Sequence, residues 1–434
     1  MLLSTQVRQR RAASRAARAA LPWTWALARR VLLRGPMTLA QPLGVVRSPQ
    51  DPLEIAQELA RDFAATAIER DRRGGNAKRE RDLLRDSGLL ALSVPVEFGG
   101  GGASWSLVLE VVRIFARVDP SLAHLFGFQH LMLATLRLFG TPEQWRPLYQ
   151  RSVQEAWFWG NALNPLDART TLIPDGEAYL IDGWKSFCSG SVDSDMLIVS
   201  AQRTDETRLH VAAIPTSRSG VVVHGDWDNM GQRQTDSGSV QFQNVRIFAD
   251  ELLASPGPLG SVFASLRPCI AQSILANVYV GIAEGALAEA RGYTKTSRRP
   301  WIHSTAKSAS DDPYVLHRYG ELWIDVEAAR LFCDRAGLLL SSAWAQGDAL
   351  TPRERGEAAL AIATAKVAGT RAGLHVTNGM FDVMGARATQ ASADVDRYWR
   401  NLRTHTLHDP VDYKLRELGD FALNDRVPVP SFYS

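Results

Sequence analysis

Cysteine is scarce in this chain of 434 residues, which contains only Cys188, Cys269 and Cys333. Three widely spaced cysteines exclude a disulfide framework, fit a reducing compartment and offer no metal-ligand spacing, so we expect no metal site. An apolar run of about 18 residues, which a transmembrane helix requires, is also missing. So is a basic stripe of the kind that binds nucleic acid. We therefore expect a cytoplasmic protein with no membrane span and no nucleic-acid partner.

The excess of positive over negative charge is confined to the first segment of the chain. Residues 1–50 contain nine arginines and no acidic residue, so the remainder holds 40 basic against 46 acidic residues. Its net charge is −6, whereas the whole chain has +3. A start of this kind is typical of a transit-like or membrane-surface segment. It also fits an unstructured extension upstream of a second start at Met37, and we expect a disordered basic extension over residues 1–50.

Helix signals dominate residues 51–160. Three helix starts share a cap residue, a proline at the first helical position and a charged or amide side chain at the third, which can bond back to the cap. They are Asp51–Glu54, Thr141–Gln144 and Thr351–Glu354. A glycine run, Gly99–Gly102, interrupts the first helical region. It lacks the preceding strand that a dinucleotide-binding loop needs, so we interpret it as a plain loop.

The pattern changes to short β-rich runs between residues 161 and 255. Strands are predicted at Tyr179–Ile181, Met196–Ala201, Leu209–Ile214, Val221–His224 and Val240–Ile247. Their spacing predicts a small antiparallel barrel or sandwich. From residue 256 to 434 long helices return. One apolar helical stripe contains Leu322, Val326, Ala329, Cys333, Ala336 and Leu340, and a further helix is expected from Pro352 to about Phe381. Such stripes predict a helical bundle.

Three segments resemble signatures of the acyl-CoA dehydrogenase superfamily. They are Leu84–Leu90 with the following Val94-Pro95, the flavin-facing segment Gly183–Ala201, and Gly231–Ser239. The resemblance implies a mostly α, α+β fold with an N-terminal α-domain (51–160), a middle antiparallel β-barrel or sandwich (161–255) and a C-terminal four-helix bundle (256–434).

One position separates this chain from many such dehydrogenases. Where they carry the glutamate that removes a substrate proton, Thr406–Pro410 supplies His408 and Asp409. From Pro52 to Ser434 the chain instead resembles the dibenzothiophene monooxygenase group. The best matches are His124–Gly127, Trp159–Asn161, Phe187–Gly190, Asp226-Trp227, Gln234–Gly238, Arg299–Trp301, Phe381–Arg387 and Arg400–Lys414.

This resemblance implies a two-component oxygenase. A separate NAD(P)H:flavin reductase would supply reduced FMN by diffusion, and O2 would form a flavin C4a-hydroperoxide that oxygenates a small apolar aromatic or organosulfur substrate. A nicotinamide-binding fingerprint is absent from the chain, as this scheme requires. Phe128 and Leu163–Pro165 depart from the family pattern beside the expected substrate pocket. Dibenzothiophene-like S-oxidation is therefore one possible reaction among several.

His408 is the first catalytic candidate, because a histidine with a pKa of about 6.5 can give or take a proton near neutrality. The resemblance implies that Asp409 orients a neighbouring group or stabilises its charge. It also implies that His124, Asn161 and Ser189 line the same pocket. His124 lies in an apolar stretch, where a histidine is as often a hydrogen-bonded core residue. His405 is expected to be structural, and Cys188 is expected to be a buried apolar residue.

Flavin contacts are expected from several residues that match the family. Short polar side chains fix the ring edge, and aromatic side chains wall it off. The expected contacts are Asn161, Ser189, Phe128, Phe187, Trp227, Arg299 and Arg387. The two arginines suit a phosphate, because a guanidinium binds phosphate oxygens in pairs. Arg233 and Arg298 are alternatives. In this superfamily such an arginine reaches a flavin held partly by a neighbouring subunit, so a homotetramer, a dimer of dimers, is implied.

Two other functions compete with the oxygenase. An acyl-CoA dehydrogenase using FAD needs a carboxylate base, for which Asp409 is one methylene shorter than the usual glutamate. A non-catalytic scaffold would need none of the retained polar residues.

Overall fold

The computed structural model describes residues 51–203, 205–206 and 208–434, so the extension predicted at residues 1–50 lies outside the described residues. The first part is helical, as predicted. It contains α2 (Pro52–Arg73), α3 (Lys78–Asp86), α4 (Trp105–Ala116), α5 (Pro120–Phe139) and α6 (Pro142–Gln154), with short 3-10 turns η1 (Leu89–Ala91) and η2 (Val96–Phe98).

The three predicted helix starts are confirmed. The Asp51 carboxylate accepts a hydrogen bond from Leu53 N at 3.0 Å at the start of α2. Thr141 N donates to the Gln144 side chain, also at 3.0 Å, at the start of α6. Thr351 N donates to Glu354 at 3.0 Å, at the start of a third helix, α9 (Pro352–Met384). Each bond satisfies a backbone group that the first helical turn cannot pair.

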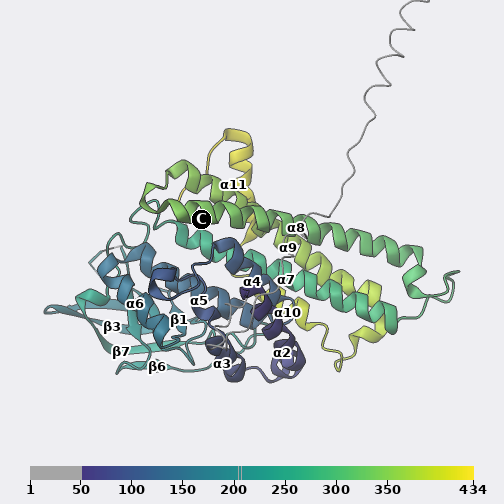
Figure 1. Ribbon diagram of the computed structural model, residues 1–434, viewed down its shortest axis with the longest axis horizontal. Helices are drawn as coiled ribbons and strands as arrows, with labels where there is room; N and C mark the ends of the chain where they lie inside the picture. The colour runs from purple at the N-terminus through teal and green to yellow at the C-terminus, as the bar shows by residue number, and fades with distance from the viewer. Residues whose placement is uncertain (1–50, 204, 207) are drawn as a thin grey trace, which may run out of the picture. The chain divides into compact units, whose positions relative to one another are not determined.

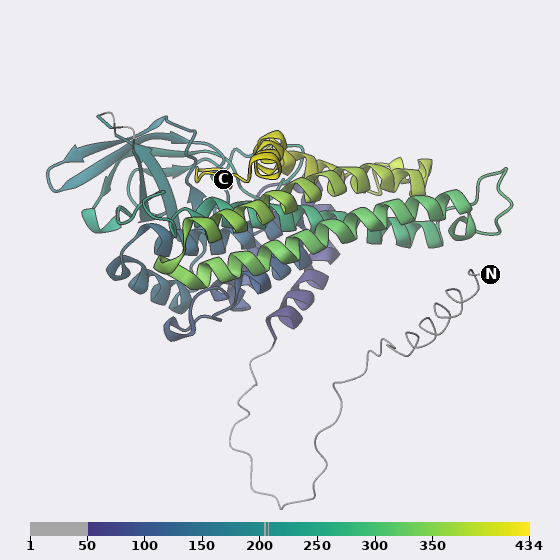
Figure 2. The ribbon, with the colours of Figure 1, turned by 90° about the horizontal axis from the view of Figure 1, so that it is seen from above.

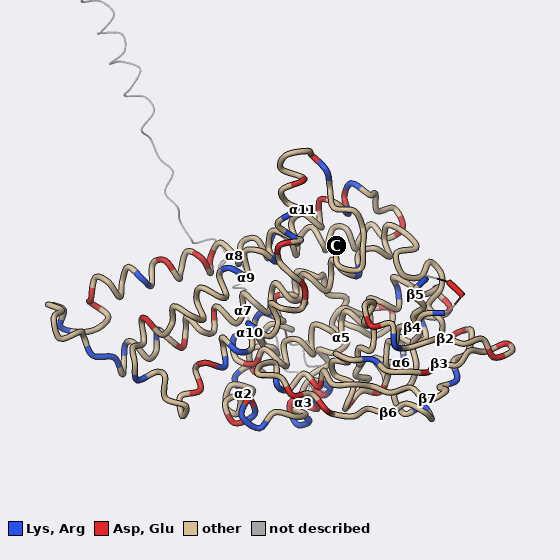
Figure 3. Tube along the Cα trace, turned by 180° about the vertical axis from the view of Figure 1, so that it is seen from behind, with Lys and Arg blue, Asp and Glu red and all other residues tan. Residues whose placement is uncertain are grey.

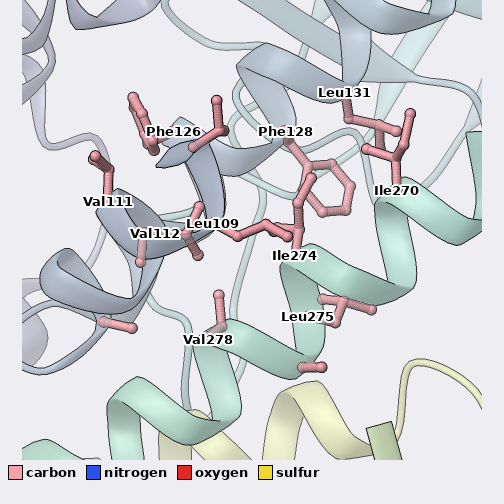
Figure 4. Close-up of a cluster of buried hydrophobic side chains, with 14 of the residues drawn as sticks. Leu109, Val111, Val112, Phe126, Phe128, Leu131, Ile270, Ile274, Leu275 and Val278 are labelled. Atoms are coloured by element: carbon pink, nitrogen blue, oxygen red, sulfur yellow. The ribbon is translucent and has the colours of Figure 1, made fainter. Parts of the chain in front are cut away.

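Helix α5 is the centre of the main core. Of its side chains only Arg137 is more than slightly exposed, and α4 and α7 (Leu266–Thr296) pack against it (Figure 4). Gly127 makes the close approach of α5 to α7 possible, because a Cβ there would lie 2.4 Å from Ile274 Cγ2. Side chains on α5 therefore have little room to move.

The middle of the chain forms one curled sheet. Its strands are β1 (Trp159–Ala162), β2 (Thr170–Asp175), β3 (Ala178–Lys185), β4 (Met196–Gln202), β5 (Leu209–Pro215), β6 (Val221–Val223) and β7 (Val240–Ile247). Their order is β1-β4-β2-β3-β7-β6, and β5 pairs with β4. A second, smaller hydrophobic cluster fills this region, including Leu172, Ile181, Val199 and Phe242.

The antiparallel prediction holds for most of the sheet and fails at strand β4. The pairs β2–β3, β3–β7, β4–β5 and β6–β7 are antiparallel, but both β1 and β2 run parallel to β4. The chain leaves α6 at the same end of the sheet at which β4 begins, and the β2–β3 hairpin lies within the connection between them. Strands β1 and β2 themselves were missed, whereas the five predicted strands are present with slightly different ends.

Long helices form the last part of the described chain. They are α7, α8 (Pro313–Gln346), α9, α10 (Arg397–Thr406) and α11 (Val411–Asn424), with 3-10 turns η3 (Ala249–Glu251), η4 (Ala309–Asp311), η5 (Gly347–Ala349) and η6 (Ala386–Thr389). Figures 1 and 2 show α7, α8 and α9 side by side, with the strands gathered at one end of them. The predicted stripe on α8 is confirmed, since all six of its residues are buried.

Helix α7 is long and apolar enough to span a membrane, by length and composition alone. However, 83% of its most apolar window is buried inside the protein, where it contacts α4, α5, α8 and α9. Burial of this kind is what a central core helix shows. The exposed loops and helix faces carry charges of both signs, interspersed along the trace (Figure 3).

The last residues fold back onto the helices. Arg355 of α9 donates to the Ser434 carbonyl and to the Ser265 hydroxyl, the latter at 3.1 Å. Lys414 of α11 donates to the Tyr433 carbonyl. These bonds bring the Tyr433 ring to 6.2 Å from that of His408, between ring centroids.

Candidate functional site

Two loops of the sheet region are fastened to each other where β3 ends. The first, Phe187–Gly190, has positive φ angles at Phe187 (60°) and Gly190 (73°), which turn the chain sharply. Cys188 N donates to Gly238 O at 2.9 Å, and Gly190 N donates to Thr235 O at 2.8 Å. These bonds fix the first loop against the second, residues 232–238.

Three hydroxyl side chains form a continuous hydrogen-bonded chain between these loops. Ser189 Oγ lies 2.8 Å from Ser237 Oγ, and Ser237 Oγ lies 2.7 Å from Thr235 Oγ1. Thr235 then donates to the Gln232 carbonyl at 3.0 Å. At the other end Ser189 Oγ is 3.0 Å from Nε2 of His124, which α5 supplies. All four side chains are buried, so the chain is a neutral, water-excluded wall.

Two more rings pack on His124. Phe128 stacks on it at 3.9 Å between ring centroids, and the His405 ring lies 4.8 Å away. Burial, followed by repulsion from His408, lowers the pKa of His124 to about 3, and burial lowers the pKa of His405 well below its usual value. Both rings are therefore neutral at pH 7. The Nδ1 atoms of both rings are buried without a hydrogen-bond partner among the described residues.

His408 has a different environment. Its side chain is 40% exposed, and Nδ1 lies 3.0 Å from Asp409 Oδ1. The same carboxylate oxygen lies 3.0 Å from Nζ of Lys366, a buried residue of α9. Burial alone would raise the pKa of Asp409, but the hydrogen bond from His408 and the charge of Lys366 outweigh it. The pKa of Asp409 is consequently held far below its ordinary value, and the carboxylate stays ionised.

Asn161 lies on β1 beside Ser189. Its backbone N donates to the Ser189 carbonyl at 2.9 Å, and its side-chain oxygen accepts from Leu163 N at 3.2 Å. Phe187 and Trp227 meet edge to face at 5.9 Å, and Phe187 is 60% exposed. Trp227 is held by a hydrogen bond from Nε1 to the Gln232 carbonyl at 2.8 Å. The structure thus places an aromatic pair, the exposed Phe187 and the half-buried Trp227, at the edge of the hydroxyl chain.

A buried ion pair supports both loops from behind. Arg81 of α3 donates to Asp236 at 2.8 Å and to the Gly190 carbonyl at 3.0 Å. Its guanidinium also lies 4.0 Å from the centroid of the Phe158 ring. One side chain therefore holds the second loop at Asp236, between Thr235 and Ser237, and the first loop at Gly190.

Arg299 and Arg387 are not part of this cluster. Both are exposed, and within the described ranges neither makes an ion pair or a side-chain hydrogen bond. Arg299 follows the end of α7, whereas Tyr279, which donates to the His405 carbonyl at 2.8 Å, lies in its middle. The 17 residues of α7 between Tyr279 and Thr296 rise roughly 25 Å. Lys366 of α9 bonds Asp409, and Arg387 follows the end of that helix at Met384, 18 residues later, a rise of roughly 27 Å. The two arginines are therefore far from His124 and His408 of the same chain.

The alternative arginines have other partners. Arg233 donates to the carbonyls of Asp71 and Arg72 at the end of α2, and Arg298 donates to the Asp382 carbonyl at 2.7 Å. Both guanidinium groups thus bond backbone carbonyls near the ends of helices. The prediction for Cys188 is confirmed, because the residue is fully buried and burial raises its pKa to about 12.

Several members of the cluster were not singled out from the sequence. Thr235 and Ser237 were quoted only as part of a signature, and their hydroxyls could have been noticed as a polar pair in a buried loop. His405 was expected to be structural, but its ring lies against His124. No sequence pattern indicates a role for Lys366, because it is one residue in a long helix. Its partner Asp409 lies 43 positions away in the chain.

Comparison with known proteins agrees with this arrangement. Models of the acyl-CoA dehydrogenase N-terminal, middle and C-terminal domains match residues 51–153, 161–245 and 273–413. These matches follow the predicted order of domains, although the domain boundaries themselves stay predictions.

Three relatives are close in sequence or structure. The chain is 58% identical to the probable FMNH2-dependent monooxygenase SfnC of Pseudomonas putida, over 89% of this chain and 98% of the relative. The methanesulfinate monooxygenase MsuC of Pseudomonas fluorescens superposes with a TM-score of 0.87 and 57% identity, covering 88% and 100% of the two chains. TdsC of Paenibacillus sp. A11-2, a dibenzothiophene monooxygenase solved with FMN and indole, gives 0.84 and 43%, covering 88% and 99%.

These matches extend over nearly the whole length of each relative. The chain therefore belongs to the acyl-CoA dehydrogenase superfamily and, within it, to the group of dibenzothiophene monooxygenase-like, flavin-dependent monooxygenases.

Proposed function

We propose that this protein is a monooxygenase that uses reduced FMN and O2 to oxygenate an organosulfur or apolar aromatic compound. The observation that carries this function is the state of Asp409. The Asp409 side chain is only 9% exposed and bonds both Lys366 and His408, so it is not available as a free base. The partly exposed ionisable side chain at this position is His408, which suits proton exchange with a polar intermediate.

The residues present fit a reduced flavin. A planar ring can cover the exposed Phe187 and the adjoining Trp227, and the hydroxyl chain at Ser189 offers neutral hydrogen-bonding groups at the ring edge. The buried Nδ1 atoms of His124 and His405, which lack a partner among the described residues, support a polar ligand at this place. When bound, reduced FMN would supply the electrons that activate O2.

The side chains of this protein then have distinct tasks. His408 donates Nδ1–H to Asp409 and can take up or release a proton at Nε2. His124 and Ser189 provide hydrogen-bonding groups that carry no charge. The stacked Phe128 and the buried loops exclude water from that surface, which protects a reactive species from hydrolysis. We assign catalytic roles to His408, Asp409, His124, Ser189 and Asn161 on this basis.

The acyl-CoA dehydrogenase alternative fits less well. Removing the proton α to a thioester needs an ionised carboxylate in direct contact with that carbon. Asp409 is held by two hydrogen bonds, its pKa is lowered, and its side chain is short. A carboxylate so strongly stabilised is a weak base.

An organosulfur substrate is the choice that the relatives favour. MsuC is named for methanesulfinate, and TdsC is a dibenzothiophene monooxygenase. Both compounds contain a carbon-bonded sulfur that can still accept oxygen. In this chain Phe128 and Leu163, both buried, replace the polar residues expected at the pocket border, which favours an apolar substrate body.

A separate flavin reductase completes the system. The chain carries no nicotinamide-binding fingerprint, and the three matched domain models leave no described segment long enough for a reductase domain. We therefore infer that reduced FMN arrives by diffusion from an NAD(P)H:flavin reductase, and that both proteins work in the cytoplasm.

We also infer a homotetramer in which neighbouring subunits share the flavin. Arg299 and Arg387 lie too far from His408 of their own chain for one FMN molecule to reach both, so a partner subunit's pair would bind the phosphate. Helix α8 exposes large apolar side chains at a spacing that puts them on one face, suited to subunit contact. They are Trp323, Ile324, Leu331 and Leu338.

Complementation between subunits tests the shared site. Arg299→Ala and His408→Phe are each expected to be inactive alone, because one lacks the phosphate contact and the other lacks the proton-transfer group. Mixed oligomers assembled by co-expression would regain part of the wild-type activity, since one kind of interface then has both groups intact. No recovery in verified mixed oligomers would mean that each subunit holds its own flavin.

Oxygenation itself is tested by stopped-flow absorbance. The protein is mixed with photoreduced FMN and then with oxygenated buffer, without substrate and without reductase. A slowly decaying absorbing species, different from both reduced and oxidised FMN, is expected because the buried site protects it. Direct reoxidation with no such species would contradict the proposal. A preparation that is yellow with bound FAD and bleaches with acyl-CoA would favour the dehydrogenase.

A further inference from the structure

Lys366 is a buried cation near the middle of α9. Its side chain is only 1% exposed, and burial lowers its pKa. A buried ammonium group is unfavourable unless it is paired and hydrogen-bonded. Here Nζ donates to Gln272 Oε1 of α7 at 2.7 Å and to Asp409 Oδ1 at 3.0 Å, and it lies 5.3 Å from the centroid of the Tyr279 ring.

One oxygen of the Asp409 carboxylate connects Lys366 to His408. Asp409 Oδ1 bonds both Lys366 and Nδ1 of His408, each at 3.0 Å. The ring of His408 is thereby oriented with Nδ1 as the donor, and Nε2 is the atom left for proton exchange. The carboxylate that orients the ring is neutralised by the ammonium on its other side, so His408 faces an ion pair with no net charge.

We propose that Lys366 is a positioning residue that sets the protonation of His408 by sharing the charge of Asp409. A lone carboxylate next to His408 would stabilise the imidazolium strongly and hold its proton above neutral pH. Sharing Asp409 with Lys366 weakens that hold while keeping the orienting hydrogen bond.

Other ionisable groups near His408 do not take over this role. His124 of α5 and His405 of α10 are neutral, because burial lowers their pKa values. Tyr433 of the C-terminal segment is also neutral, since burial and then Asp409 raise its pKa. Arg267 of α7, beside Tyr433, has a pKa lowered to about 10 and remains charged. Its guanidinium instead donates to the Thr135 hydroxyl at 2.9 Å, whereas Lys366 bonds the Asp409 carboxylate.

The titration of His408 tests the proposal without flavin. Protein with ¹³C-labelled histidine rings is titrated by NMR in the FMN-free form, and the His408 signal is identified by its loss in His408→Phe. Two variants alter the shared charge in the same direction: Lys366→Met removes the cation, and Gln272→Glu adds a carboxylate on its far side. Each is expected to raise the pKa of His408 by roughly half to one pH unit, because net negative charge increases near the imidazole.

A matched control separates charge sharing from a lost buried ion pair. Arg113 of α4 is buried and bonds Asp334 of α8 at 2.7 Å, away from this network. Arg113→Met is expected to leave the His408 titration unchanged. Gln272→Glu keeps the size of the side chain, so it decides the question even if Lys366→Met does not fold. An unchanged His408 pKa in Gln272→Glu overturns the proposal.

The contribution to turnover rests on the proposed function and is measured separately. With reduced FMN and substrate, the limb of the pH–rate profile that reports His408 should move to higher pH by the same amount as the NMR titration. An NMR shift without that movement overturns the role of Lys366 in the reaction. Absence of oxygenation in the wild-type protein would instead refute the proposed function, and the NMR result would still stand.

Discussion

The two walls of the site differ in their electrostatics. On the sheet side, Ser189, Ser237 and Thr235 form a buried chain of neutral hydroxyls. On the helical side, His408, Asp409 and Lys366 form a chain of ionisable groups that starts at a partly exposed ring. A neutral chain has the same hydrogen bonds at pH 6 and at pH 8, whereas an ionisable chain changes its charge with pH. The sheet side is therefore suited to holding a ligand, and the helical side to moving protons.

The same contrast appears between two histidines of the site. His124 is fully buried against Phe128, and its pKa is lowered to about 3. His408 is 40% exposed and bonds an ionised carboxylate. Two residues of the same type therefore have different surroundings, and burial keeps one of them, His124, neutral.

Replacing His408 should have the largest effect, because it removes the partly exposed ring to which we assign proton exchange. His408→Phe is expected to reduce product formation by roughly 10²- to 10⁴-fold while the fold and FMN binding remain largely intact. Product analysis with photoreduced FMN measures this. His375→Phe is the control, since His375 is an exposed ring that also bonds an aspartate, Asp325, at 2.7 Å. Normal product formation by His408→Phe would remove the catalytic role.

Breaking the hydroxyl chain should have a smaller effect of a different kind. Ser189→Ala removes the partner of both His124 and Ser237, and each lost or unsatisfied bond costs about 1–3 kcal/mol. We expect turnover to fall roughly tenfold to a hundredfold, with the shape of the pH–rate profile unchanged. Ser194→Ala is a matched control, because its hydroxyl bonds Thr216 at 2.7 Å outside the cluster. A shifted pH–rate profile in Ser189→Ala would contradict the claim that the hydroxyl chain does not influence the pH dependence of turnover.

The neutral histidines should make stability depend on pH. Burial lowers the pKa of His124 and His130 to about 3 and that of His405 further below its usual value. As the pH falls below about 6.5, the unfolded chain binds protons that the folded chain cannot, so stability is lost. Each such residue contributes about 1.4 kcal/mol per pH unit in that range.

Urea unfolding between pH 7 and pH 5.5 measures this slope. His130 bonds Ser93 at 2.8 Å on the far side of α5 from the candidate site, so His130→Gln should reduce the slope without changing turnover. An unchanged slope would mean that His130 can be protonated in the folded protein.

The aromatic pair should show the smallest effect. Phe187→Leu is expected to weaken the binding of reduced FMN a few-fold, because it removes the ring that we propose the flavin covers. The melting temperature should stay unchanged, since Phe187 is 60% exposed. Phe248→Leu, at another exposed aromatic of the sheet region, controls for surface changes. Unaltered FMN affinity in Phe187→Leu would remove that residue from the flavin site.

Much of the fold could be predicted because local signals determine it. The caps at Asp51, Thr141 and Thr351 and the apolar stripe of α8 involve residues within a few turns of each other. Strand β1 was missed because its sequence, Trp159–Ala162, is short, contains glycine and is buried on both faces. Its parallel pairing with β4 depends on where the chain leaves α6, which no local pattern encodes.

The candidate site could be predicted only in part, for the same reason. Family motifs pointed to His408, Ser189, His124 and Asn161, and the structure brings these into one region. The buried partners Lys366 and Gln272 come from helices more than 40 residues away in the chain from His408. The exposed Arg299 and Arg387 could be matched by motif, but their distance from His408 required the structure.

The burial of Cys188 has a consequence for an enzyme that handles oxygen. Its sulfur sits immediately before Ser189, yet it is fully buried, and burial raises its pKa to about 12. Oxidants attack the thiolate of an accessible cysteine, and Cys188 offers neither thiolate nor access. Cys269 and Cys333 are likewise buried with raised pKa values. The protein should therefore survive many turnovers without oxidising its own thiols, and peroxide that escapes from the site should inactivate it slowly.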